Sequence, residues 1–192
     1  MSQIDLGDSR LFVVLWKCDQ ELAREAKEEA GGCSECGGAL HQGNYPRKPR
    51  GGRGQLGPEY KLRLSFCCST EGCRSRLTPP SVRFLGPRVY LGAVVVLVSA
   101  LRGGLSDRRA AELKSLIGVS VRTLRRWREW WQSVFITSPF WKSVRAHLMP
   151  PIDTATVAAS LVERFGKSLD DLRRLLTFLS PITTSAGLTM AG

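Results

Sequence analysis

The sequence predicts a mainly α-helical fold that carries one small β unit, and three observations support this prediction. Apolar residues recur at helical spacing from Val89 to Trp131 and again after Asp153. Residues 33–88 are rich in glycine, proline and arginine, and they contain only short alternating runs of the kind that form strands. Two groups of cysteines lie within this same region, so we expect the β unit to be organised around them.

The pattern divides the chain into four segments. Gly31-Gly32, Pro79-Pro80 and Pro150-Pro151 interrupt the periodic runs and mark breaks between elements. The segments are an N-terminal strand or helix over 1–30, the β unit over 31–88, a three-helix unit over 89–135, and C-terminal helices with a flexible tail over 136–192.

The first segment is predicted to contain a short helix. An apolar run extends from Leu11 to Trp16, and Asp19 then offers an oxygen that can cap a helix running through Glu29. Gly31 follows and ends that helix.

Two features of the sequence bear on localisation. The polar, acidic N-terminus does not resemble a signal peptide. The longest apolar stretch, Val89 to Leu101, is shorter than the roughly 20 residues that a membrane-spanning helix needs, so it is expected to be a buried helix. We therefore expect a cytoplasmic, nucleoid-associated protein without a membrane partner.

The first group of cysteines has the spacing of a metal-binding knuckle. Cys33 and Cys36 are close enough in sequence to face one ion, and the glycines that follow let backbone N–H groups turn toward the sulfurs. The second group contains Cys67, Cys68 and Cys73. We predict a zinc ribbon in which Cys33, Cys36, Cys68 and Cys73 hold one zinc ion, with Cys67 and Cys73 as the alternative second corner.

The strand pattern favours the corner with Cys68, and the corner with Cys67 stays open. Residues 60–66 alternate like a half-buried strand, with Tyr60, Leu62, Leu64 and Phe66 on one side. Cys67 follows this strand and should point away from Cys68.

Four thiolates leave no open position on zinc, so the site is expected to be structural and not catalytic. Disulfide bonds between these cysteines are an alternative to zinc, but they would need an oxidising compartment, which nothing in the sequence supports. Cys18 is expected to be a buried small residue, and His41 could replace a cysteine ligand, although four thiols suffice.

The positive charge is concentrated where the motifs lie. The net charge is +11 and the pI is about 9.9, which favours a polyanionic partner. Residues 41–90 and 101–131 carry most of the excess, whereas residues 1–40 are net acidic. A proline- and glycine-containing loop between the zinc corners is predicted to follow a DNA backbone or enter a minor groove. Its cations are Arg47, Lys48, Arg50 and Arg53, and the basic character continues with Arg74, Arg76, Arg83 and Arg88.

Residues 106–131 have the pattern of two helices separated by a turn. Ser106 is a candidate N-cap for a helix with Ala110, Ala111 and Leu113 inward, and Ile117-Gly118 makes the turn. Ser120 then caps a helix whose inward face holds Val121, Leu124, Trp127 and Trp131. The outward face is predicted to enter a DNA major groove, and it presents Arg122, Thr123, Arg125 and Arg126.

The run from Gly118 to Trp127 resembles the homeodomain-like helix-turn-helix of bacterial transposases and resolvases. Together with the cysteine unit, roughly residues 33–131 resemble the DNA-binding region of insertion-sequence transposases and of accessory proteins encoded beside them. The resemblance implies double-stranded DNA as the partner and a separately encoded transposase as a second candidate partner.

No catalytic centre is expected. Four carboxylates follow Trp131, and the pattern around them is helical, without the strands that carry the acidic triad of a transposase. The two histidines, His41 and His147, have no matching carboxylate motif for a nuclease. We therefore predict a DNA-binding accessory or regulatory protein of a mobile element, which is not an enzyme.

The alternative is a transcriptional regulator unrelated to transposition. Its dimerisation surface would lie within residues 152–179, where the C-terminal helices could pair two chains. The leucines and phenylalanine of that candidate surface are Leu161, Phe165, Leu169, Leu172, Leu175, Leu176 and Leu179.

Overall fold

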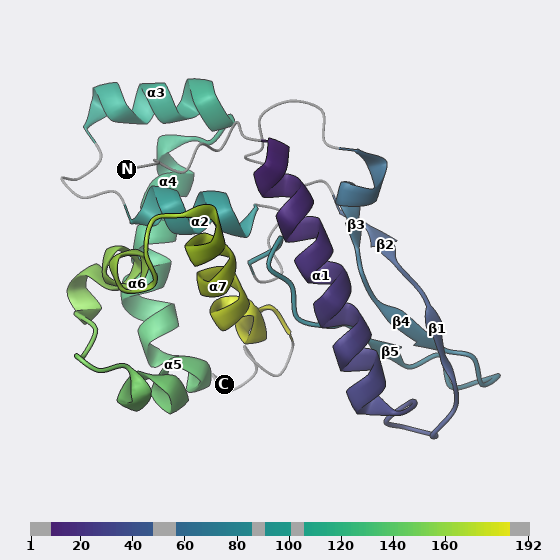
Figure 1. The fold of residues 1–192 in the computed structure, drawn as a ribbon. Helices are drawn as coiled ribbons and strands as arrows, with labels where there is room; N and C mark the ends of the chain where they lie inside the picture. The colour runs from purple at the N-terminus through teal and green to yellow at the C-terminus, as the bar shows by residue number, and fades with distance from the viewer. Residues whose placement is uncertain (1–8, 48–56, 86–90, 101–105, 185–192) are drawn as a thin grey trace.

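A computed structural model describes residues 9–47, 57–85, 91–100 and 106–184. This part of the chain is mainly helical with a small antiparallel sheet, as the sequence predicts (Figure 1). No helix among the described residues is long and apolar enough to cross a membrane. The α-helices are α1 (Ser9–Ala30), α2 (Gly92–Ser99), α3 (Asp107–Ile117), α4 (Val121–Trp130), α5 (Pro139–Val144), α6 (Val157–Phe165) and α7 (Leu169–Leu179).

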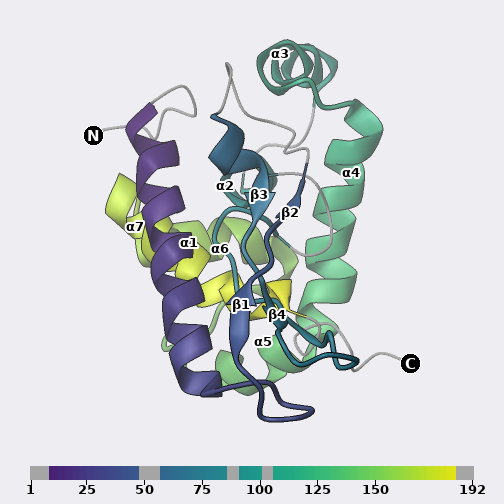
Figure 2. The same cartoon turned by 90° about the vertical axis from the view of Figure 1, so that its right-hand side faces the viewer.

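The strands lie together on one side of the molecule, beside α1 (Figures 1 and 2). β1 pairs with β4, and β4 also pairs with β5, in a three-stranded antiparallel sheet. β2 and β3 form a second antiparallel ladder that continues the first. The strands are β1 (Leu40–Gln42), β2 (Tyr45–Pro46), β3 (Leu62–Arg63), β4 (Phe66–Cys68) and β5 (Arg76–Leu77), and the 3₁₀ turn η1 (Pro58–Lys61) precedes β3.

The prediction of one regular strand over residues 60–66 is wrong. Tyr60 belongs to η1, and the chain breaks its pairing at Leu64 and Ser65 before β4 begins. The amide of Ser65 donates to the side chain of Asn44 at 3.0 Å. Arg63 is buried as well as Leu64, and Nη2 of its guanidinium donates to the carbonyl of Pro79.

α1 begins ten residues before the predicted cap. Its first half packs an apolar face that includes Leu11, Leu15 and Cys18, spaced as on one side of a helix. Asp19 is therefore not an N-cap: it lies inside the helix and is buried. The helix ends as predicted at Gly31, whose φ of 61° suits glycine.

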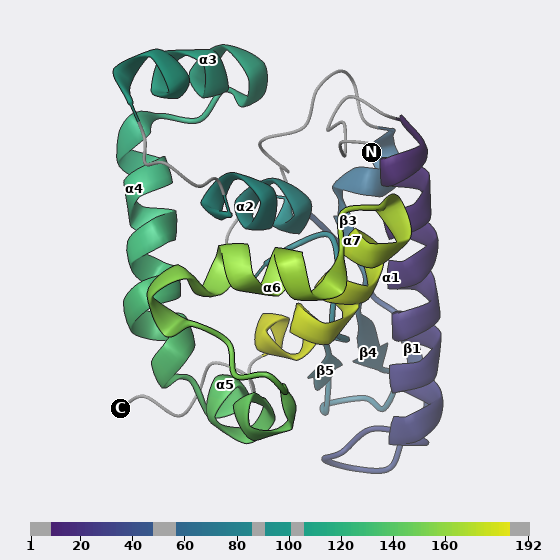
Figure 3. The same ribbon diagram turned by 60° about the vertical axis from the view of Figure 1, so that its left-hand side comes forward.

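One large core joins α1 to the helices of the C-terminal half. Figure 3 shows α2, α6 and α7 lying between α4 on one side and α1 on the other. α2 is apolar all round and buried, as predicted for the stretch that begins at Val89, of which residues 91–100 are described here. α1 and the C-terminal helices, which the sequence assigns to separate segments, thus contribute to the same core.

The C-terminal leucines are part of this core. Leu161, Leu172, Leu175, Leu176 and Leu179 are each at most 2% exposed within one chain. They pack against α1 and α2, so they do not form the free surface that the sequence suggested for pairing two chains.

A second, smaller core lies within the β unit. Its buried members are Cys33, Leu40 and Cys68, and Phe66 and Leu77 pack against them. Such a cluster contains little apolar area, so the cysteines themselves must help to hold this unit together.

Candidate metal centre and basic helix face

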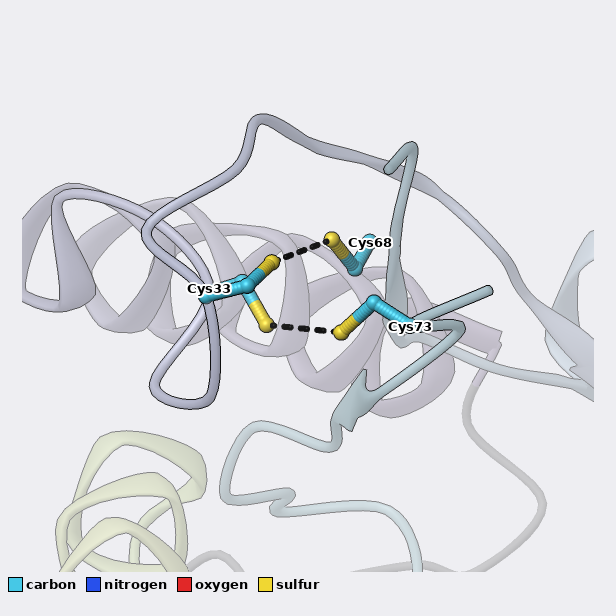
Figure 4. A group of neighbouring side chains, drawn as sticks. Cys33, Cys68 and Cys73 are labelled. Atoms are coloured by element: carbon cyan, nitrogen blue, oxygen red, sulfur yellow. Dashed lines mark hydrogen bonds between the residues drawn. The ribbon is translucent and has the colours of Figure 1, made fainter. Parts of the chain in front are cut away.

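Four cysteine sulfurs from two separate corners of the chain converge in the β unit (Figure 4). The Sγ atoms of Cys33 and Cys73 are 3.7 Å apart, and those of Cys36 and Cys68 are 3.4 Å apart. All four sulfurs lie within 4.8 Å of one another. A tetrahedral zinc with Zn–S bonds of about 2.3 Å has sulfurs about 3.8 Å apart, so the four side chains fit one such ion.

The first corner depends on tight glycine turns. The amide of Gly37 donates to the carbonyl of Cys33 at 2.8 Å, and Gly37 has a φ of 70°. At Gly38 the limit is space: a Cβ there would lie 2.1 Å from Oγ1 of Thr70 and 3.1 Å from Sγ of Cys68. The closeness of the two corners therefore requires glycine at this position.

The second corner is the turn between β4 and β5. The amide of Cys68 donates to the carbonyl of Ser75 at 2.9 Å, and Gly72, with a φ of 82°, lets the chain reverse before Cys73. Cys67 points elsewhere, with its Sγ 3.7 Å from the carbonyl oxygen of Arg74. The strand thus brings Cys68 and not Cys67 to the cluster, as the alternation of side chains in β4 predicts.

The other two candidates for metal binding lie outside the four-sulfur cluster. His41 is exposed on β1 opposite Cys67. Cys18 is buried in α1, where its sulfur lies 3.5 Å from the hydroxyl oxygen of Thr177. Cys18 is thus the buried residue that the sequence predicts.

Hydrogen bonds favour the thiolate at two of the four cysteines. Backbone N–H groups of Glu35 and Cys36 lower the pKa of Cys33. The hydroxyl of Thr70 and the N–H of Gly38 lower the pKa of Cys36 to about 6. Thiolates are the form that binds metal. Thr70 was not identified from the sequence, although its place in the spacer between Cys68 and Cys73 is a signal.

Cys73 behaves in the opposite way. An N–H of Ser75 lowers its pKa, but the neighbouring sulfur of Cys36 and burial outweigh this and raise the pKa to about 12. Sulfurs this close cannot all be anionic unless a cation compensates them. The donor set therefore suits a divalent cation, which would compensate the thiolate charges in place of the thiol protons.

A second candidate site is the exposed face of α4. Figures 1 and 3 show α3 at one end of the molecule and α4 running away from it along one side. A short turn joins the two helices at Gly118, whose φ is 64°, and Ser120 caps α4 by accepting from the amide of Thr123. The turn and the cap are those that the sequence predicts.

Most side chains of these two helices are buried or exposed as the sequence predicts. Leu124, Trp127 and Trp131 are buried, and Val121 is half-buried. Arg122, Arg125 and Arg126 are exposed. In α3, Ala110 and Ile117 are buried and Leu113 is half-buried, but Ala111 is exposed because it falls on the opposite side of the helix.

The predicted exposure of Thr123 is wrong. The sequence placed it on the exposed face with the arginines, yet it is only 6% exposed. It lies in the first turn of α4, where its amide and hydroxyl oxygen both contact the capping side chain of Ser120. The side chain faces inward because the cap occupies this part of the helix surface.

The predicted basic loop is described only at its start. Arg47 follows β2, and its guanidinium lies over the ring of Tyr45 at 5.4 Å. Arg76 also lies over that ring, at 5.5 Å. The other three cations of the loop, Lys48, Arg50 and Arg53, lie outside the described residues, as does Arg88.

The predicted surface position of Arg83 is also wrong. The sequence predicts that Arg83 extends the basic surface, but its side chain is fully buried. Its charge is compensated by Asp19, and its guanidinium also donates to the carbonyls of Tyr60 and Leu62. The position of Asp19 on the apolar face of α1 is the signal that could have revealed this pair.

A shallow trough of about 480 Å³ lies between α1 and the strands. Trp16, Leu62, Leu64 and Phe66 make it largely apolar, and the Nζ of Lys27 lies 5.3 Å from the centre of the Phe66 ring. Glu59 is the one carboxylate among its lining residues, so the trough does not present a pair of acidic groups.

Comparisons of the chain with protein-family models, with curated proteins and with solved structures find no match. The geometry of the four sulfurs and of the arginine face is therefore what indicates a function.

Proposed function

We propose that this protein binds duplex DNA through α3 and α4, acting as a helix-turn-helix, and that a four-thiolate zinc site stabilises the adjoining β unit. The observation that carries the proposal is the exposed arginine face of α4. Three arginines project from a helix that Leu124 and Trp127 anchor in the core, together with Trp131 directly after it. A rigid helix with guanidinium groups on its outer face suits the major groove, because guanidinium groups bond both phosphates and guanine edges.

The overall charge supports the same partner. A net charge of +11 attracts a polyanion over distances longer than any single contact. Binding through arginine and lysine releases counterions from DNA, so the affinity depends strongly on salt.

Zinc has a structural role in this proposal. Four cysteine ligands complete the coordination of zinc and leave no position for a substrate. When bound, the ion supplies a cross-link between the two corners. Cys33 and Cys36 would hold it from one corner, and Cys68 and Cys73 from the other.

We further propose an accessory or regulatory role in a mobile element, beside a separately encoded transposase. The resemblance of residues 33–131 to transposase DNA-binding regions supports this role. In the C-terminal half, Asp153 caps the 3₁₀ turn η4 (Thr154–Thr156), and Asp170 and Asp171 pair with arginines of α7. These carboxylates serve local structure, which is consistent with a chain that acts through DNA binding.

The test is binding to a fluorescent duplex, measured by anisotropy at several salt concentrations. The triple change Arg122→Ala, Arg125→Ala, Arg126→Ala should weaken binding by about tenfold or more and reduce the salt slope by about 2 to 3, since each lost phosphate contact removes about 0.9.

A matched control removes three cations elsewhere, with Lys142→Ala, Arg145→Ala and Arg164→Ala, all exposed in the native chain. This control should weaken binding by less than about threefold. Absence of binding by the unmodified protein at low salt, or an equal loss in both triple variants, would contradict the proposal.

A further inference from the structure

The three exposed arginines of α4 are not equivalent. Nη2 of Arg126 donates to Oγ1 of Thr123 at 3.4 Å, and Thr123 is buried. Arg122 and Arg125 lie on the same exposed face, but their side chains form no hydrogen bond or ion pair with any residue in the described part of the chain. Arg126 is therefore held by the protein, whereas the other two side chains are free to move.

The hydrogen bond to Arg126 ends a chain of three polar side chains. Oγ1 of Thr123 accepts from Arg126 and also shares a hydrogen bond with Oγ of Ser120, 3.1 Å away. The Oγ of Ser120 also accepts from the backbone amide of Thr123 at 3.3 Å. The orientation of Arg126 is thus tied to the N-cap, which is fixed to the helix backbone.

We infer that Arg126 is the arginine of α4 that reads a base pair, that Thr123 is its positioning residue, and that Arg122 and Arg125 bind phosphates. This inference rests on the proposed function and assigns different tasks to residues of the same face. Reading guanine requires two donors in a fixed plane aimed at O6 and N7. Arg126 keeps such a pair, because only one of its five N–H donors is used by Thr123.

Mobility separates the two tasks. A side chain that is already oriented loses less conformational entropy when it engages a base edge. Phosphate oxygens accept from many directions and carry no sequence information, so a mobile arginine serves them equally well. The observed difference between Arg126 and its two neighbours therefore predicts a division between specificity and affinity.

The experiment first selects a preferred duplex from a random pool with the full-length protein. The dissociation constants for this duplex and for a scrambled duplex are then measured over a range of salt concentrations. The specificity ratio is the dissociation constant for the scrambled duplex divided by that for the preferred duplex. Arg126→Ala should lower this ratio by about 10- to 100-fold, the loss expected for one bidentate contact. Arg122→Ala and Arg125→Ala should each leave the ratio unchanged and reduce the salt slope by about 1.

Thr123 is tested by a pair of variants of similar size. Thr123→Val removes the hydroxyl and should lower the ratio by about 3- to 10-fold, while binding to the scrambled duplex and the salt slope stay the same. Thr123→Ser keeps the hydroxyl and should retain the ratio. Circular dichroism of each variant checks that α4 remains folded.

The outcomes distinguish this inference from the proposal on which it rests. If the unmodified protein does not bind duplex DNA, the proposed function fails, and the inference fails with it. If the protein binds but Arg126→Ala keeps the ratio, or if Arg122→Ala lowers the ratio as much, the inference alone is overturned. If Thr123→Val and Thr123→Ser lower the specificity ratio equally, the positioning role of Thr123 is contradicted.

Discussion

Nε of Arg83 donates to Oδ2 of Asp19 at 2.7 Å, and both side chains are almost completely buried. The carboxylate also accepts from the hydroxyl of Ser81 and from the amide of Val82. The guanidinium lies over the rings of Trp16 and Tyr60, at 4.4 and 4.9 Å. This pair links the middle of α1 to the segment that leaves the β unit, so it fixes how the strands sit against the helices.

Asp19→Ala should destabilise the protein by about 3–5 kcal/mol, because it leaves the charge of Arg83 buried without its partner. The unfolding free energy from urea titration measures this loss. Arg24→Ala is the control, since the Arg24–Glu28 pair is exposed to solvent and its loss should lower the unfolding free energy far less. Similar costs for both variants would contradict the role of the buried pair.

Metal analysis of the purified protein should give one equivalent of zinc per chain. Cys36→Ser should lose the metal and lower the melting temperature, because the four thiolates converge on one point. Cys67→Ser should keep the metal, since the sulfur of Cys67 contacts the carbonyl of Arg74 instead. Retention of zinc by Cys36→Ser would contradict the assigned ligand set.

Gly38→Ala should weaken zinc binding, because the new Cβ would collide with Thr70 and crowd the sulfur of Cys68. We expect a loss of at least about tenfold in affinity, measured by competition with a chelator, the range seen for disturbed surroundings of metal ligands. Gly37→Asn is the matched change: there is open space at Gly37, and asparagine tolerates its φ of 70°. The prediction fails if both variants bind zinc equally.

Trp127→Ala should destabilise the protein by roughly 3–5 kcal/mol, because the ring is only 2% exposed and its loss leaves a cavity between α4 and the core. Arg125→Ala, in the same helix but exposed, should change stability by no more than about 0.5 kcal/mol. Thermal unfolding of both proteins distinguishes the anchoring face of α4 from its exposed face.

The pKa of Asp171 should be about 2 in the folded protein. The backbone N–H of Ser168 lowers it most, and Arg174 and the hydroxyl of Ser168 lower it further. A folded pKa below the unfolded value of about 3.9 means that the ionised group stabilises the fold above pH 4 and loses this effect as the pH falls toward 2. Titration by NMR measures the pKa, and Arg174→Ala should raise it part of the way.

Some of the candidate site followed from local rules. Two cysteines three positions apart, followed by glycines, predict a metal-binding corner because only neighbouring residues are involved. The alternation of β4 separates Cys67 from Cys68 for the same reason. The cap at Ser120 and the turn at Gly118 depend on the backbone preferences of single residues.

The tertiary structure decided what depends on partners distant in sequence. Asp19 looks like a cap and Arg83 like a surface cation until the fold places them together, and burial then makes their pairing obligatory. The C-terminal leucines look like a dimer surface because periodicity shows which face of a helix is apolar and not what covers it. The sequence pattern places Thr123 on the exposed face. Only its contacts with Ser120 and Arg126 show that it is a buried residue that supports its neighbours. Patterns of single residues thus determined the turn at Gly118, the cap at Ser120 and which cysteines come together. Burial and long-range hydrogen bonds, which arise only when the elements pack, decided which charges are available at the surface.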